Sequence, residues 1–371
     1  MSQVVPSPHD EEELRRELTS ISLPPSRYPT GWFQIGWSDE VAAGEVKLVH
    51  YFGTQIVLWR GADGQLHASH PTCMHLGGNL GVKGTVHGDR IVCPWHGWEW
   101  NPDGTNALIP HSSQTCKPRL KLQKIWHVRE WYGGSILVWH DLMNRDPLWD
   151  VPVIDELDNG NYYPFGPHSR TSWTIKAHPQ MVMENGVDAF HIPYIHGAGE
   201  VPRIVSAGPT SAGHIWESVV STSYGAGKKK TWLTPTGQIE LTLSFLLWGV
   251  GLGLANWPIE LFAARMITNP TPIDDTHSEL FWCMTTDKGD DTGDQPNEFS
   301  AKFVEHQRKT VTQDFFTWAN MEVLHPPNFA PEEGKHYAAL RRWAWQFYPD
   351  LQKPQRIPDA TRDTRGGNGE V

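Results

Sequence analysis

Short β-type runs dominate the first part of the chain. VKLVHYF, TQIVLWR, RIVC and SILVWHD are rich in β-branched and aromatic residues, and turns such as GADG and NPDG separate them. Runs of this length bounded by glycine and aspartate are typical of antiparallel strands. They predict an all-β domain over residues 31–145.

The second half of the chain mixes helical and β-type patterns. A helix is predicted over residues 179–192 and a longer one over 297–323. The β-rich segments between them are residues 214–224, 229–248 and 263–286. We expect residues 146–350 to form an α+β domain in which helices cover an antiparallel sheet.

The most apolar run, LTLSFLLWGVGLGLA at residues 241–255, raises the question of a membrane span. It is shorter than the ~20 residues that a transmembrane helix needs, and its glycines favour buried strands around a turn. The formal net charge of −11 disfavours nucleic acid or an anionic membrane as a partner. We therefore expect a protein that binds neither.

Both ends of the chain depart from these patterns. Residues 1–30 are expected to form a leader with a short charged helix at 10–19, and residues 351–371 a disordered tail. The N-terminus lacks the apolar core of a secretory signal. The cysteines number only four, which implies no disulfide framework and fits a reducing cytoplasm.

Two of the cysteines stand beside histidines, in CMHLGG and CPWHGW. Cys73 and His75 form C-x-H, and Cys93 and His96 form C-x-x-H. Thiolates and imidazoles together bind zinc or an iron–sulfur cluster. Structural zinc sites usually place two cysteines in at least one arm, whereas a [2Fe–2S] cluster with two cysteines on one iron and two histidines on the other suits two mixed arms. The pattern favours the cluster, and it resembles the Rieske family.

The remaining cysteines, Cys116 and Cys283, are too few to hold a plant-type ferredoxin cluster, which needs four. No glycine-rich dinucleotide fingerprint is visible either. We therefore expect the electrons to come from a separate NAD(P)H-dependent reductase or a ferredoxin.

A second group of candidate ligands lies in ENGVDAFHIPYIH, where Asp188, His191 and His196 form D-x-x-H-x4-H. On a straight helix the two histidines would point ~140° apart. We expect Pro193 to kink the helix and let both rings face one ion, although two core or surface histidines remain the alternative. Two histidines and one carboxylate suit non-haem Fe(II), which keeps positions open for O2.

The third ligand is expected from the 297–323 helix. Asp314 falls within an apolar stripe on that helix, whereas Glu305 and Glu322 lie on faces that look exposed. The stripe consists of Phe299, Phe303, Val311, Phe315, Trp318 and Met321. A buried carboxylate is costly unless it is paired or binds a metal, so Asp314 is predicted to be a ligand, with a structural salt bridge as the alternative.

Together the two motifs resemble the catalytic subunit of Rieske non-haem iron oxygenases. The short second half and the ending LRRWAWQFY are similar to the 3-ketosteroid 9α-hydroxylase oxygenase component and the cholesterol 7-desaturase group. The resemblance implies an all-β Rieske domain followed by a helix-grip catalytic domain. It implies that Cys73, His75, Cys93 and His96 bind a [2Fe–2S] cluster and that His191, His196 and Asp314 bind mononuclear Fe(II).

The resemblance also implies roles for two neighbouring residues. Asp188 would link His191 to His96 of the partner subunit in a homotrimer, and Asn185 matches a residue that the family keeps near the iron, with helix capping as an equal alternative.

The expected function is that of a terminal oxygenase, which uses O2 to hydroxylate a bulky hydrophobic substrate such as a 3-ketosteroid. The run FLLWGVGLGLANW could roof the substrate pocket or simply pack in the core. Alternatives are aromatic or aryl-amine substrates, N-oxygenation and steroid desaturation. Two non-enzyme alternatives also remain, a Rieske electron carrier, which would contain two irons per chain rather than three, and a colourless zinc-stabilised binding module.

Overall fold

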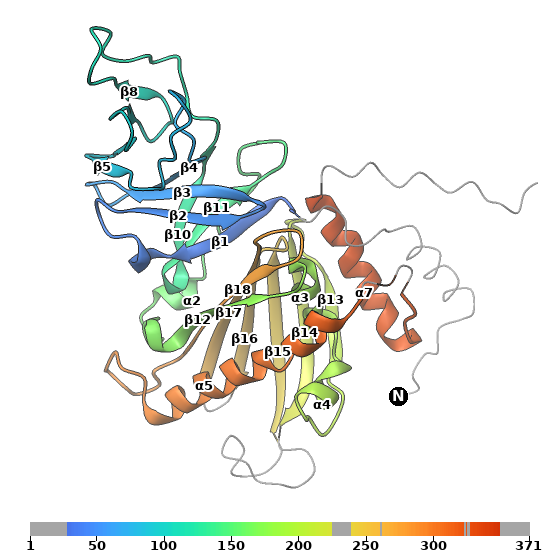
Figure 1. Ribbon diagram of the computed structural model, residues 1–371. Coiled ribbons are helices and arrows are strands. Elements are labelled where there is room, and N and C mark those ends of the chain that lie inside the picture. The colour runs from blue at the N-terminus through green and yellow to red at the C-terminus, as the bar shows by residue number, and fades with distance from the viewer. Residues whose placement is uncertain (1–27, 225–238, 260–261, 323, 325–326, 349–371) are drawn as a thin grey trace, which may run out of the picture.

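The computed structural model describes residues 28–224, 239–259, 262–322, 324 and 327–348 (Figure 1). The expected leader helix, the expected tail and the first part of the 229–248 segment lie outside the described residues. The described chain forms a smaller all-β unit followed by a larger unit of one sheet and several helices. The predicted α+β fold class is therefore confirmed.

Three small antiparallel sheets build the N-terminal unit. The first contains β1 (Gly31–Trp37), β11 (Ser135–His140) and β10 (Val128–Trp131) in that order. The second contains β2 (Val46–Tyr51), β3 (Thr54–Arg60), β4 (Leu66–Ser69) and β9 (Ile125–Trp126). The third contains β5 (Thr85–His87), β6 (Arg90–Val92), β7 (Glu99–Trp100) and β8 (Asn106–Leu108). Two short 3-10 helices, η1 (Ser38–Glu40) and η2 (Tyr132–Gly134), complete the unit.

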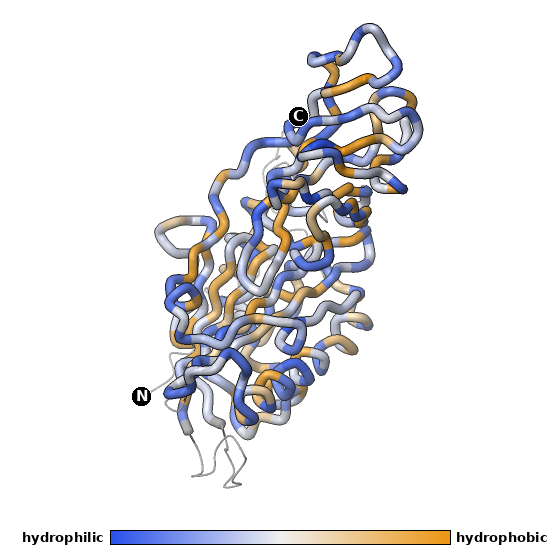
Figure 2. Tube along the Cα trace, turned by 90° about the vertical axis from the view of Figure 1, so that its left-hand side faces the viewer, coloured by the Kyte–Doolittle hydropathy of each residue, from blue (hydrophilic) through white to orange (hydrophobic). Residues whose placement is uncertain are grey.

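A seven-stranded antiparallel sheet forms the centre of the C-terminal unit. Its order is β12 (Arg170–Ile175), β18 (Ser278–Thr286), β17 (Phe262–Pro272), β16 (Leu252–Ile259), β15 (Ile239–Trp248), β14 (Ile215–Tyr224) and β13 (Arg203–Pro209). In the side view of Figure 2, hydrophobic stretches follow these strands. The apolar run at 241–255 lies in β15 and β16, and most of its side chains are buried, which confirms the predicted buried strands around a turn.

Helices lie over the large sheet and around one end of it (Figure 1). They are α2 (Asp155–Asp158), α3 (Pro179–Glu184), α4 (His191–Ile195), α5 (Glu298–Thr312), α6 (Phe315–Asn320) and α7 (Pro331–Ala344), with the 3-10 helices η3 (Pro167–Ser169), η4 (Asn185–Val187) and η5 (Trp345–Phe347). Among the described helices, none is both long and apolar enough to cross a membrane.

The long helix expected over 297–323 is instead two helices. Asn297 caps α5 by accepting a hydrogen bond from the backbone N–H of Ser300, at 2.9 Å. The chain then turns at Gln313 and Asp314, where the N–H of Gln313 bonds to the carbonyl of Thr310 in a tighter 3-10 pattern, and α6 follows. The interruption falls beside the residue predicted to be a metal ligand.

The two units share one hydrophobic core, to which both β1 and the large sheet contribute. Buried polar contacts reinforce the junction, because Asn269 donates to the side chain of Gln34 at 2.9 Å and the Thr271 hydroxyl donates to the Gln34 carbonyl at 2.6 Å. A Cβ atom on Gly251 would come within 2.3 Å of the Trp32 carbonyl, so this turn requires glycine. The β5–β8 end of the N-terminal unit therefore projects away from the C-terminal unit in a defined direction (Figure 1).

Candidate metal centres

Two loops of matching geometry carry the cysteine–histidine pairs of the N-terminal unit. Each loop closes on itself through two backbone hydrogen bonds to its cysteine. The bonds are Cys73 N to Gly78 O (2.8 Å), Gly77 N to Cys73 O (3.0 Å), Cys93 N to Trp98 O (2.8 Å) and Gly97 N to Cys93 O (3.0 Å). Gly77 and Gly97 adopt φ angles of +80° and +69°, which favour glycine. The sequence therefore needs these glycines to shape both loops.

The four predicted cluster ligands converge between these loops. Cys73 and Cys93 are buried, and the His75 and His96 rings lie 4.7 Å apart at 76°. Burial, together with the neighbouring Cys93, raises the pKa of the Cys73 thiol to about 11. Two inward sulfurs and two outer imidazoles fit the donor set of a Rieske [2Fe–2S] cluster, whose positive irons would hold the thiols as thiolates.

The helix expected over 179–192 is not continuous, and the second site begins where it is interrupted, after α3 and η4. The Asp188 carboxylate oxygen Oδ1 accepts the backbone N–H groups of Phe190 (3.1 Å) and His191 (3.2 Å), which ends one helix and starts α4. Pro193 lies in the first turn of α4, where its missing N–H costs no hydrogen bond. The expectation that Pro193 kinks the helix is therefore wrong, because the break precedes His191.

The structure brings His191, His196 and Asp314 together. The Asp314 Oδ1 atom lies 3.4 Å from His196 Nε2 and 3.9 Å from His191 Nε2, and one donor atom from each residue falls within 4.8 Å of the others. The two rings stand 5.2 Å apart at 75°. All three side chains are largely buried, so the arrangement fits a two-histidine, one-carboxylate site for Fe(II).

Each of the three side chains has a second contact that orients it. His191 Nδ1 lies 3.4 Å from Asp188 Oδ2, His196 Nδ1 lies 2.8 Å from Gln313 Oε1, and Asn185 Nδ2 donates to Asp314 Oδ2 at 3.3 Å. Both rings thus turn Nδ1 outward and Nε2 toward the common centre. Such contacts fix the orientation of metal-binding histidines. The part played by Gln313 was missed from the sequence, where its only signal is its place next to Asp314.

The electrostatics of the site favour a bound cation. Burial raises the pKa of Asp314, although His196 and His191 act in the opposite direction. Burial also opposes ionisation of Asp188 and His191. Their contact with each other outweighs burial, so that the pKa of Asp188 is lowered and that of His191 is raised. A buried carboxylate that no cationic side chain fully neutralises is stabilised by a metal ion.

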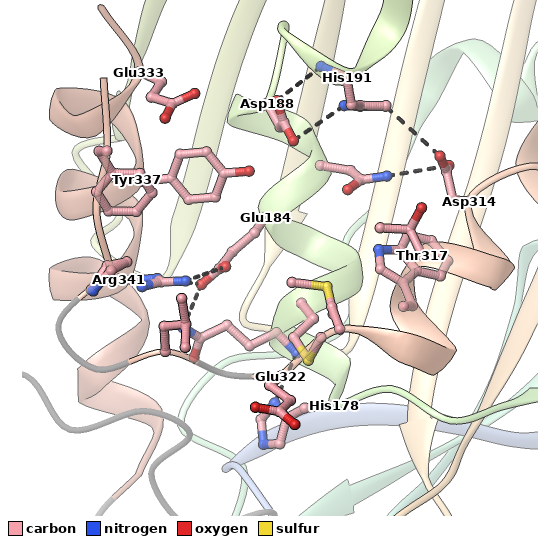
Figure 3. A pocket seen from close by; sticks show the side chains of 18 of the residues that line it. His178, Glu184, Asp188, His191, Asp314, Thr317, Glu322, Glu333, Tyr337 and Arg341 are labelled. Carbon is pink, nitrogen blue, oxygen red and sulfur yellow. Dashed lines mark hydrogen bonds and ion pairs between the residues drawn. The ribbon is translucent and has the colours of Figure 1, made fainter. Parts of the chain in front are cut away.

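A cavity of about 310 Å³ opens beside these residues (Figure 3). Its apolar lining comes from Met181, Ile195, Trp318, Met321, Leu324, Pro327 and Phe329. Its polar lining comes from His178, Gln180, Glu184, Asn185, Asp188, His191, Asp314, Thr317, Glu322, Asn328, Glu333, Tyr337 and Arg341. The volume lies at the lower end of the range for ligand pockets.

The run at 245–257 does not line this cavity, so the suggestion that it forms the roof is wrong here. Leu247, Trp248 and Leu252 instead pack in the shared core, as the alternative interpretation held. The contribution of α7, which brings Tyr337 and Arg341 to the cavity, was not predicted from the sequence. No local pattern marks these residues, because their partners lie about 150 positions earlier in the chain.

The fold and the two sites define a Rieske non-haem iron oxygenase. Residues 31–126 match the Rieske [2Fe–2S] domain, and residues 138–348, more than half of the chain, match the 3-ketosteroid 9α-hydroxylase C-terminal domain. The chain belongs to the family that this C-terminal domain defines.

Similar curated proteins agree with this assignment. The chain is 28% identical to the 3-ketosteroid-9-alpha-monooxygenase oxygenase component of Mycolicibacterium smegmatis, over 91% of this chain and 86% of that protein. It is 36% identical to cholesterol 7-desaturase of Hemicentrotus pulcherrimus, over 50% of this chain and only 39% of that protein.

Solved structures share the fold. NdmA of Pseudomonas putida CBB5 with caffeine superposes with a TM-score of 0.67 at 15% identity, over 90% of this chain and 92% of that one. Dicamba monooxygenase bound to 3,6-dichlorosalicylic acid superposes with a TM-score of 0.68 at 15% identity, over 87% of this chain and 98% of that one.

Proposed function

We propose that this oxygenase hydroxylates a bulky, apolar substrate of the steroid class. The observation that carries the proposal is the His191, His196 and Asp314 cluster, which opens on a cavity with extensive apolar lining. Relatives named as 3-ketosteroid-9-alpha-monooxygenase oxygenase components cover more than nine-tenths of the chain and support the substrate class.

In this proposal the four residues of the matching loops, Cys73, His75, Cys93 and His96, hold the [2Fe–2S] cluster. His191, His196 and Asp314 hold Fe(II). When bound, the cluster supplies single electrons and the mononuclear iron supplies O2 activation. Asp188 and Gln313 fix the two imidazoles, and Asn185 orients Asp314 by donating to its outer oxygen.

The apolar lining contributes by excluding water from the reacting C–H bond. Ile195 directly precedes His196, Trp318 follows Asp314 by about one helical turn, and both side chains line the cavity. A dry site suits an apolar substrate and limits unproductive reaction with water.

We also propose that electrons reach this site from a neighbouring copy in a homotrimer. The loops that hold the cluster ligands lie in the N-terminal unit, whose far end projects away from α4 (Figure 1). Leu76 and Trp95 beside these ligands are 61% and 60% exposed, and such an apolar tip suits a protein contact. A head-to-tail ring brings one chain's tip to the next chain's Asp188.

The cellular site in this proposal is the cytoplasm. All four cysteines are free, which suits a reducing compartment. An NAD(P)H-dependent reductase or a ferredoxin there would supply the electrons.

The test is substrate-dependent O2 uptake with a reductase, over a panel of 3-ketosteroids, cholesterol and aromatic amines. We expect 3-ketosteroids to stimulate uptake and to gain one oxygen atom. Products that instead lose two hydrogen atoms would assign a desaturase, as in the cholesterol 7-desaturase relative, and uptake with aromatic amines alone would overturn the steroid class.

Asp188→Asn tests the electron path. We expect this variant to keep both metals but to oxidise its reduced cluster at least about tenfold more slowly in single turnover, because the charged link is lost. An unchanged rate would exclude Asp188 as the bridge.

A further inference from the structure

Three pairs of polar side chains face one another between the segment leading into the mononuclear site and the C-terminal segment 337–348. The Tyr348 hydroxyl donates to Gln180 Oε1 at 2.9 Å, and Arg341 binds both oxygens of Glu184 at 2.8 Å each. The third pair is Tyr337 and Asp188, and Figure 3 shows the Tyr337 hydroxyl directed toward the Asp188 carboxylate. Gln180, Glu184 and Asp188 follow one another at intervals of four residues through α3 and the end of η4, so the three pairs form a ladder that ends at Asp188.

The middle contact anchors the ladder. Glu184 and Arg341 have side-chain exposures of only 9% and 12%, and Gln180 Nε2 also donates to Glu184 Oε1 at 3.0 Å. A bidentate guanidinium–carboxylate pair fixes both distance and angle between two helices. It places the side chain one turn earlier on α7, Tyr337, opposite Asp188 (Figure 3).

The ring of Tyr337 is held in that position. It stacks on Phe329 with centroids 4.9 Å apart at 25°, and the Arg341 guanidinium lies 5.7 Å from its centroid. Figure 3 shows its hydroxyl directed toward Asp188. The hydroxyl therefore reaches the carboxylate from a side chain with little freedom.

Asp188 has few other constraints on its orientation. Its Oδ1 atom accepts two backbone N–H groups of the α4 start, and its Oδ2 atom faces His191 Nδ1 at 3.4 Å. The two backbone N–H groups hold Oδ1, whereas Oδ2 has only the His191 contact, and 3.4 Å is long for a hydrogen bond. The Tyr337 hydroxyl is a further polar group directed at this carboxylate.

We propose that Tyr337 is a positioning residue, which holds the Asp188 carboxylate in the orientation that links the two metal centres. The inference rests on the proposed function of Asp188 as the electron bridge. Tyr337 also lines the cavity, but in this role it acts through Asp188 and not on the substrate or the metal. It acts by keeping Asp188 directed at His191 and toward the neighbouring copy.

The test compares Tyr337→Phe with Tyr163→Phe in the full chain. Tyr163 is a matched control, because its hydroxyl also donates to a carboxylate, Asp291, at 2.6 Å, in the same unit but outside the cavity. Two quantities are measured. One is the single-turnover rate of cluster oxidation with substrate and O2, and the other is hydrogen exchange at the Phe190 and His191 amides, with and without metal.

We expect Tyr337→Phe to keep its iron content and visible spectrum. Its cluster oxidation should slow about tenfold or more, and exchange at the two amides that Asp188 holds should accelerate by a similar factor, since the polar group directed at the charged carboxylate is lost. Tyr163→Phe should match the wild type in both measurements.

Tyr337→Phe behaving like the wild type in either measurement would overturn the inference, and so would equal slowing in both variants. A wild-type protein without substrate-dependent cluster oxidation would overturn the proposed function instead. In that case the amide exchange alone still decides whether Tyr337 positions Asp188.

Discussion

Removing the Asp314 carboxylate should affect metal binding and stability in opposite directions. Asp314 is 8% exposed, and burial raises its pKa. In the metal-free protein the ionised group at pH 7 therefore costs stability, and this cost is relieved as the pH falls through its raised pKa. We expect metal-free Asp314→Ala to be as stable as the wild type or more stable at pH 7.

Bound Fe(II) should instead make the wild type more stable than Asp314→Ala. At an Fe(II) concentration of 100 times the wild-type Kd, binding stabilises the protein by about 2.7 kcal/mol. Loss of one of three protein ligands should weaken binding by at least about 100-fold, because even supporting contacts are worth 10–100-fold. The variant would then gain only about 0.4 kcal/mol at the same concentration.

The assay is thermal unfolding under anaerobic conditions with and without Fe(II). The difference of about 2.3 kcal/mol corresponds to roughly 5–9 °C in the metal-induced rise of Tm for a unit of about 200 residues. Asp141→Ala is the matched control, because Asp141 is also buried but pairs with Arg145 at 2.7 Å in the N-terminal unit. It should lose stability without metal and keep the full metal-induced rise.

A structural salt bridge predicts the opposite behaviour for Asp314. If Asp314→Ala destabilised the metal-free protein as Asp141→Ala does, and retained the Fe(II)-induced rise in Tm, Asp314 would not be a metal ligand.

Two further predictions concern the cluster loops and the pH dependence. Gly78→Ala should lower cluster content severalfold, since the new Cβ would lie 3.1 Å from Cys93 Sγ. The control Gly208→Ala, whose new Cβ would meet no atom within 4 Å, should keep its cluster. Equal visible absorbance per chain in the two variants would refute this prediction. In the metal-free protein the raised pKa of His191, which Asp188 sustains against burial, contributes stability below the ordinary histidine pKa of about 6.5 that is lost as the pH rises through the raised value. The free energy of unfolding should fall across that range in the wild type and fall less in Asp188→Asn; identical profiles would contradict the pairing.

Local spacing explains how much of the two sites was predictable. The cluster ligands lie in two short loops, and Asp188, His191 and His196 lie within nine residues, so their proximity follows from the chain itself. Asp314, more than 100 residues further along the chain, was predicted because an acid interrupted an apolar stripe, and the structure places it beside both histidines. That stripe holds at Phe303 and Trp318, which are 1% and 7% exposed.

The stripe does not extend to its two ends, where Phe299 in the first turn of α5 is 36% exposed and Met321 after the end of α6 is 48% exposed. The role of Pro193 was mistaken as well. Sequence periodicity assumes a continuous helix, whereas the chain leaves the helix at Asp188, whose carboxylate accepts the N–H groups of Phe190 and His191 where α4 begins.

The contribution of α7 could not be predicted locally. Tyr337 and Arg341 reach Asp188 and Glu184 only through the packing of helices far apart in the chain, and the ladder has no motif of its own. The apolar run at 245–257 could not be assigned from its composition either, because the same residues suit a pocket wall or a core. Only the tertiary structure places it in the core.

The central claim is that one chain holds two separate iron centres. Iron-edge anomalous diffraction from metal-replete crystals, combined with iron analysis, tests it most directly. We predict three irons per chain, two between the Cys73 and Cys93 loops and one among His191, His196 and Asp314. Two irons per chain with signal at the loops only, in protein loaded with excess Fe(II), would contradict the account.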